Sequence, residues 1–81
     1  MLKVSFTSSF RLALGGKSQL ELEASTIRQL LTRLVADYPA MQQHLDEGIA
    51  VAIDGEIYRD NWNITIPCDS EVFLIPRIQG G

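Results

Sequence analysis

This 81-residue sequence is poor in cysteine and has no long apolar run. Cys68 is its single cysteine, so no disulfide can form within the chain. No apolar run approaches the roughly 20 residues of a membrane-spanning helix. The segment MLKVSFTSSFRLALGG at the beginning lacks the apolar core and the cleavage site of a signal peptide. We therefore expect a cytoplasmic protein without a membrane segment.

Basic charge is also scarce. Seven lysine and arginine residues stand against ten aspartate and glutamate residues, for a formal net charge of −3 at pH 7. The basic residues are spread along the sequence, whereas binding to nucleic acid or to anionic lipid needs them clustered. We expect no nucleic acid and no membrane as partner. The charge balance instead suits a protein partner with a basic docking face.

Residues with catalytic chemistry are few and scattered. Cys68 has no histidine near it in sequence and no CxxC partner, so we interpret it as a structural or incidental thiol. His44, within MQQHLDE, is interpreted as a solvated helix residue. The acidic residues between positions 46 and 60 do not have the spacing of a metal-binding loop. We expect no bound cofactor, no metal and no catalytic constellation, and the burial of Trp62 is left open.

What is present is the composition of a folded chain, with 46% apolar and 21% charged residues. The length suits a single domain over residues 1–81, with a free energy of unfolding of about 4 to 12 kcal/mol. Repeats, linkers and low-complexity segments are absent from the sequence.

Two stretches near the start, LKVSFTS and QLELEA, alternate apolar and polar residues, which is the pattern of half-buried strands. The apolar positions are Leu2, Val4, Phe6, Leu20 and Leu22. Residues 15–17, Gly-Gly-Lys, form a turn between the two stretches. The sequence therefore predicts a hairpin joined through a glycine turn.

The next segment, STIRQLLTRLVADYP, changes to the period of a helix. Its apolar residues fall on one stripe and are Ile27, Leu30, Leu31, Leu34 and Val35. Ser25 or Thr26 can cap the helix, and Thr26 with Gln29 matches a capping box. Pro39 disfavours helical geometry at Tyr38, so we expect the helix to end there.

Three short strands are predicted in the second half of the chain. PAMQQHL first adds a further helical turn, with Pro39 at its first position and Gly48 closing it. IAVAI (Ile49–Ile53) and EIYR are strands joined at Asp54-Gly55, a strong hairpin signal. ITIP is a brief extended piece, and EVFLIP (Glu71–Pro76) is the last strand.

The order strand, strand, helix, strand, strand, strand predicts a two-layer α+β domain, with a small mixed sheet curled around one main helix. In the last strand Phe73 and Ile75 alternate with Val72 and Leu74, so one pair faces the helix and the other faces outward. An outward Phe73 and Ile75 would form an apolar docking patch beside the end of the chain.

The chain ends on Gly80 and Gly81, which no requirement of folding explains. The strand order, the length and the ending DSEVFLIPRIQGG resemble the ubiquitin-like β-grasp sulfur carriers of the MoaD/ThiS family, and most of all the small subunit of molybdopterin synthase. The family more often has an Asp-Gly-Asp-type turn at Cys68-Asp69-Ser70, a second proline at Arg77 and a small residue at Gln79. These departures leave the pathway open.

The resemblance implies that an adenylating enzyme of the ubiquitin-activating type uses ATP to activate the Gly81 carboxylate. A sulfur donor then converts the carboxylate to a thiocarboxylate, which passes its sulfur to a precursor held by a larger synthase subunit. Residues 77–81 would be an extended flexible tail of roughly 17 Å that reaches into the partner's active site. The expected partner contacts are Phe73, Ile75, Pro76, Arg77, Ile78, Gln79 and Gly80.

Two other functions stay open. The sulfur could serve thiamine, cysteine or secondary-metabolite synthesis instead of molybdopterin. Alternatively, the chain could be a β-grasp interaction module or a protein modifier without sulfur transfer. As a carrier, the chain would act as a sulfur-donating subunit or co-substrate of partner enzymes, so whether to count it as an enzyme is undecided.

Overall fold

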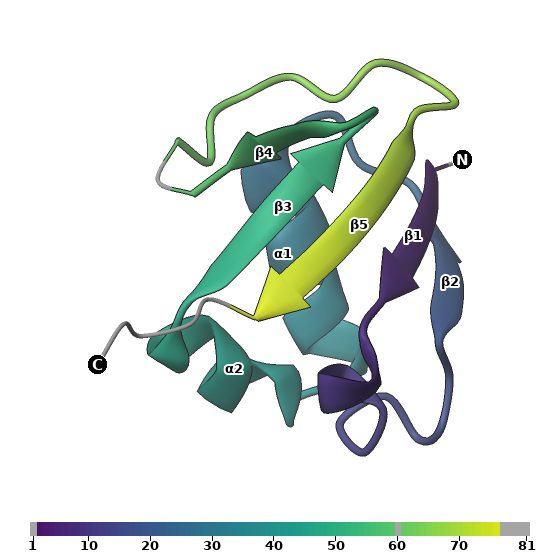
Figure 1. The fold of residues 1–81 in the computed structure, drawn as a ribbon, viewed down its shortest axis with the longest axis vertical. Coiled ribbons are helices and arrows are strands. Elements are labelled where there is room, and N and C mark those ends of the chain that lie inside the picture. Colours follow the sequence, from purple (N-terminus) through teal and green to yellow (C-terminus); the bar gives the residue numbers. More distant parts are fainter. Residues whose placement is uncertain (1, 60, 77–81) are drawn as a thin grey trace.

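The computed structural model describes residues 2–59 and 61–76 of the chain (Figure 1). The elements are β1 (Leu2–Phe6), a 3₁₀ turn (Ser8–Phe10), β2 (Gln19–Leu22), α1 (Ile27–Asp37), α2 (Met41–Glu47), β3 (Ile49–Ile53), β4 (Glu56–Tyr58) and β5 (Glu71–Pro76). The order of two strands, a main helix and three strands is the one that the sequence predicts.

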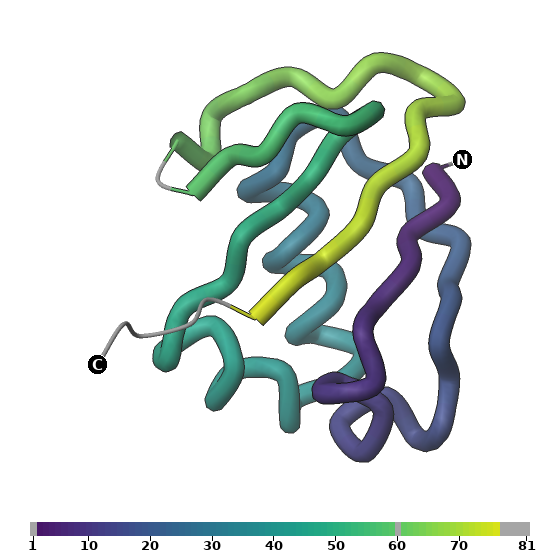
Figure 2. The backbone as a smooth tube through the Cα atoms, viewed as in Figure 1, coloured from purple at the N-terminus to yellow at the C-terminus, as the bar shows by residue number. Residues whose placement is uncertain are grey.

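The strands form one sheet in the order β2-β1-β5-β3-β4. The two terminal strands of the chain, β1 and β5, lie side by side and parallel, while the other neighbouring pairs are antiparallel. Both views show α1 behind the sheet, crossing one of its faces (Figures 1 and 2). This is the α+β, ubiquitin-like β-grasp arrangement expected from the sequence.

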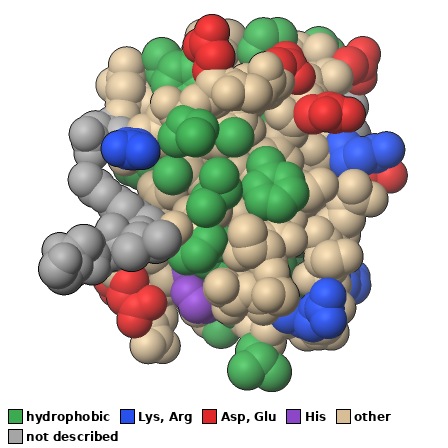
Figure 3. Space-filling view, in the orientation of Figure 1, with side chains coloured by type: hydrophobic (Ala, Val, Ile, Leu, Met, Phe, Trp, Pro, Cys, Tyr) green, Lys and Arg blue, Asp and Glu red, His purple; other side chains and the backbone are tan. Residues whose placement is uncertain are grey.

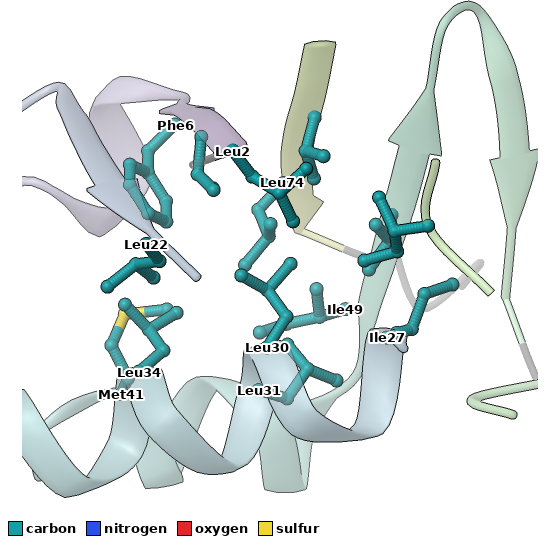
Figure 4. Close-up of a cluster of buried hydrophobic side chains, with 14 of the residues drawn as sticks. Leu2, Phe6, Leu22, Ile27, Leu30, Leu31, Leu34, Met41, Ile49 and Leu74 are labelled. Carbon is teal, nitrogen blue, oxygen red and sulfur yellow. The ribbon is translucent and has the colours of Figure 1, made fainter. Parts of the chain in front are cut away.

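The core lies between the sheet and the apolar stripe of α1 (Figure 4). Leu30 and Leu34 of α1 have no exposed surface, and neither has Leu74, which comes from β5. The predicted stripe is therefore confirmed, with Val35 at its half-buried edge. Burying one such side chain stabilises the fold by about 1.5 to 3 kcal/mol.

The start of α1 is capped by side chains and by a distant loop. The Thr26 hydroxyl accepts a hydrogen bond from the Gln29 amide at 3.1 Å, as predicted, but the Gln29 side chain accepts from the Ser25 amide at 2.8 Å. The next free amide, that of Ile27, donates to the Ile64 carbonyl at 3.2 Å. The segment after β4 is thereby tied to the helix. The extended piece predicted at ITIP makes only one bridge, between Thr65 and Thr26.

Two local predictions need correction. β1 and β2 pair as a hairpin, but residues 7–18 connect them, and this connection contains the 3₁₀ turn as well as the glycine turn. Its side chains Phe10 and Leu14 are fully buried, so the connection contributes to the core. The second helix begins at Met41 and not at Pro39, whose carbonyl instead accepts a hydrogen bond from the Gln42 amide at 3.0 Å.

Three other predicted features are confirmed: the end of α1, the closure of α2 by Gly48 and the turn after β3. α1 ends at Asp37, one residue before Tyr38. α2 ends at Glu47 and is followed by Gly48, which caps it with a positive φ of 115°. Asp54 and Gly55 have φ values of 48° and 93° and join β3 to β4. Positive φ at both central residues is the geometry of a tight hairpin turn that matches the twist of the strands.

Candidate functional site

The last strand, β5, occupies the centre of the sheet and leads to the end of the chain. Its neighbour β1 pairs with it only as far as Leu74, opposite Phe6. Ile75 and Pro76 continue beside β3 alone, opposite Ala50 and Ile49. Pro76 has no amide hydrogen to donate, so it cannot extend the hydrogen-bonded ladder. The pairing of β5 with β1 therefore ends two residues before Pro76.

Five of the predicted partner-binding or reacting residues, Arg77, Ile78, Gln79, Gly80 and Gly81, lie outside the described residues. Their roles, and the expected extended tail over 77–81, stay predictions. The described part of the predicted site consists of Phe73, Ile75 and Pro76, all on β5.

Phe73 and Ile75 lie on the outer face of the sheet, as the alternation predicts. Val72 and Leu74 are buried against the helical layer, whereas 41% of Phe73 is exposed and Ile75 is half-buried. Figure 3 views this outer face and shows hydrophobic side chains gathered in its middle. The predicted apolar patch is therefore present beside the last described residues.

The patch extends over residues that the sequence reasoning missed. The register places Phe73 opposite Ala52, and Ala52 opposite Ile57. Directly paired residues point to the same face of a sheet, so the three form one row across β5, β3 and β4. Ile57 is 54% exposed. The alternation within each strand hinted at these positions, but only the strand order brings them together.

Charged residues surround the patch at the end where β5 begins. Lys3 lies between Glu21 of β2 and Glu71 of β5 in the register of the sheet. Asp54 is hydrogen-bonded to Glu71 by its side chain, which accepts from the Glu71 amide at 3.0 Å. Three carboxylates thus accompany one ammonium group on this part of the face.

The remaining candidate side chains do not gather at the patch. His44 is half-buried and not solvated as predicted, because its ring packs edge-on against Phe10 at 4.8 Å between ring centroids. Cys68 is a free, exposed thiol. It lies three residues before β5, at the end of the sheet opposite to Pro76. Trp62 is half-buried against the core.

A hydrogen bond between two side chains of β4 affects the titration of Tyr58. The Glu56 carboxylate accepts a hydrogen bond from the Tyr58 hydroxyl at 2.7 Å and thereby raises the pKa of Tyr58. Within residues 2–59 and 61–76, no group of three or more His, Cys, Asp or Glu side chains could hold a metal ion. None of the helices in these ranges is long and apolar enough to cross a membrane.

The described part of the site offers a surface on which a protein partner could dock. It combines an apolar patch, a charged rim and the strand that leads to Gly80-Gly81.

Known proteins share this fold. The model of the ThiS family matches residues 4–81. A chain of the BexX/CysO complex from Amycolatopsis orientalis is similar over 100% of both chains, with a TM-score of 0.81 and 16% identity. Small archaeal modifier protein 1 from Methanosarcina acetivorans is 23% identical, with a TM-score of 0.78 over 99% of this chain and 95% of that protein.

A third similar structure comes from Helicobacter pylori, a complex of subunits 1 and 2 of molybdopterin-converting factor. One of its chains is 18% identical, with a TM-score of 0.70 over 99% of this chain and 97% of its own length. No curated protein sequence is similar enough to count as a relative. At these identities the similarity to solved structures concerns the fold.

Proposed function

Because the chain belongs to the ThiS family of sulfur carriers, we propose that it carries sulfur as a thiocarboxylate on Gly81. The observation that carries the proposal is the family match, which runs to residue 81 and includes Gly80 and Gly81. The central position of β5 supports it, because this strand leads directly to the reacting end.

The chemistry explains why a partner enzyme is needed. A terminal carboxylate with a pKa near ~3.5 is ionised at neutral pH and is a poor electrophile. ATP activates it when the carboxylate attacks the α-phosphorus and pyrophosphate leaves, which gives an acyl adenylate. A persulfide sulfur then displaces AMP, and a second thiol cleaves the resulting acyl disulfide to release the thiocarboxylate. The absence of Cβ atoms in Gly80 and Gly81 lets these groups approach the carbonyl closely.

The outer face of the sheet serves as the docking surface for this enzyme. Phe73, Ile75 and Pro76 fall within four positions of one strand, immediately before residues 77–81. An enzyme that holds the tail therefore lies against the patch. We propose an adenylating enzyme of the ubiquitin-activating type as the first partner, in the cytoplasm, with ATP and the sulfur donor bound by that enzyme.

We further propose molybdopterin synthesis as the destination of the sulfur, with this chain as the small subunit of a synthase and a larger subunit as acceptor. The resemblance of Asp69–Val72, Pro76 and the Gly-Gly ending to that subunit supports this choice. The similarity to a chain of the molybdopterin-converting factor complex agrees with it. The similarities to a CysO-complex chain and to a modifier protein support cysteine or metabolite synthesis, or conjugation, as the competing destinations.

The test is the intact mass of the protein after incubation with ATP, an adenylating enzyme and a sulfur donor. We expect one sulfur to replace one oxygen, mapped to Gly81, and the variant that lacks Gly81 to gain none. Leu12→Ala is the matched control, since Leu12 is 98% exposed and lies outside the patch. Sulfur transfer retained after deletion of Gly81 would sink the carrier proposal, as would the absence of adenylation with several adenylating enzymes.

The destination is tested with the thiocarboxylated protein itself. Purified larger subunit of molybdopterin synthase and its precursor should accept the sulfur and regenerate the carboxylate. Transfer to a cysteine, thiamine or metabolite enzyme instead would redirect the proposal. Adenylation followed by attachment to lysine, without sulfur entry, would favour a protein modifier.

A further inference from the structure

A hollow of about 320 Å³ opens on the outer face of the sheet beside Phe73. Its size follows from the register, which places the small residues Ser5 and Ala52 on either side of Phe73. The side chains next to the aromatic ring are therefore short, and the ring forms one wall of the hollow. Lys3 and Glu71 line the end away from Pro76.

The charge around the hollow is negative, and the Glu71 carboxylate has no ion-pair partner among the described residues. Glu71 and Asp54 line it together with a single cation, Lys3. Among residues 2–59 and 61–76, no lysine or arginine nitrogen lies within 4.0 Å of the Glu71 carboxylate. One Asp54 oxygen already accepts from the Glu71 amide. The exposed Glu71 carboxylate is therefore available to a cation from outside.

We propose that this hollow receives an arginine side chain of the enzyme that takes the tail, and that the contact helps to select that enzyme. The inference rests on the proposed function and specifies its partner. A guanidinium group is flat enough to stack on Phe73 and can form two parallel hydrogen bonds to the Glu71 carboxylate. A lysine ammonium is a compact point charge that cannot do both.

The position of the hollow agrees with this role. Phe73 and Pro76 are three residues apart on β5, about 10 Å along the strand. A partner that encloses the tail thus covers the hollow as well. An apolar side chain in its place would remove water from Glu71 and Asp54 without pairing them, which is costly.

The experiment measures adenylation rates against carrier concentration with an adenylating enzyme that turns over the wild-type protein. Glu71→Gln should raise KM about tenfold and leave kcat unchanged, because the variant loses one charged hydrogen bond to the partner. The matched control is Glu21→Gln, which makes the same change of net charge on the same face but lies outside the hollow. We expect its KM to stay within about twofold of wild type.

A second variant tests the hollow by filling it. Ala52→Leu places a larger side chain into the space and should raise KM without lowering stability, since the position is half-buried and faces outward. Ala36→Leu makes the same change at an exposed position of α1, in the opposite layer, and should leave KM unchanged. Thermal unfolding of each variant shows whether it remains folded.

Three outcomes would overturn the inference. If both Glu71→Gln and Ala52→Leu keep the KM of the wild-type protein, the hollow stays empty in the complex. Equal effects of Glu71→Gln and Glu21→Gln would mean general charge attraction in place of a seated arginine. If no adenylating enzyme acts on the wild-type protein, the proposed function fails and the inference fails with it; failure of the variants alone leaves the proposed function intact.

Discussion

Asp54 and Glu71 are joined by two reciprocal hydrogen bonds. The Asp54 amide donates to the Glu71 carbonyl at 3.0 Å, and the Glu71 amide donates to the Asp54 carboxylate at 3.0 Å. The turn between β3 and β4 is thereby fixed to the first residue of β5. The pair also sits where the docking face begins, so a change in the turn affects both stability and the hollow.

We predict that Asp54→Ala destabilises the fold by about 1 to 2 kcal/mol, because it removes a charged acceptor and places alanine at positive φ. Asp54→Asn keeps an acceptor and tolerates this backbone conformation, so it should retain most of the stability. Urea unfolding of the two variants checks this. Equal stability of the alanine and asparagine variants would contradict it.

Leu34 and Leu12 offer a matched pair of leucines. Leu34 has no exposed surface and Leu12 is 98% exposed. We expect Leu34→Ala to lower the free energy of unfolding by about 2 to 5 kcal/mol, a large part of what a chain of this length possesses. Leu12→Ala should change it by less than about 0.5 kcal/mol. Denaturant midpoints measure both, and a stable Leu34→Ala variant would contradict the assigned core.

Phe73 is predicted to act in docking more than in folding. Its exposed ring contributes little to the core, so Phe73→Ser should change the free energy of unfolding by less than about 1 kcal/mol. The same variant should raise the KM for adenylation by about tenfold or more, because it removes an aromatic anchor from the interface. Leu12→Ala serves again as the control for loss of an exposed apolar side chain. An unchanged KM would remove Phe73 from the docking surface.

Tyr58 should titrate above its ordinary range, because its hydrogen bond to Glu56 raises the pKa of Tyr58. The contact contributes stability below the pKa of an unfolded tyrosine, and this contribution is lost as the pH rises through the folded-state pKa. Glu56→Ala should lower the pKa of Tyr58, and Glu21→Ala should not. Ultraviolet absorbance of tyrosinate in a Tyr38→Phe background reports the single remaining phenol. An unshifted titration in Glu56→Ala would contradict the assignment.

The fold was predictable where the information is local. The stripe from Ile27 to Leu34 fixes α1, and Asp54-Gly55 fixes the turn after β3. β1 pairs with β5 although their residues lie far apart in the chain: Val4 and Val72 are 68 positions apart. No local pattern encodes this pairing. Phe10 and Leu14 lie in an irregular connection without period, which is why their burial was missed.

The candidate site, too, was predictable only where the information is local. Alternation within one strand was enough to place Phe73 and Ile75 on the outer face. Ala52, Ile57 and Ser5 join them only through the strand order, so the row and the hollow could not be predicted. The burial of His44 depends on contact with Phe10, a residue 34 positions earlier in the chain, and was mistaken for solvation for this reason.

The central position of β5 also determines how the protein responds to force. A partner that draws the chain end into its active site pulls β5 along its own axis. The pull then loads the hydrogen bonds to β1 and to β3 in shear, where many must break together, whereas an edge strand could be peeled away one bond at a time. If the proposed function holds, the carrier can therefore be pulled by the end of its chain and keep its fold.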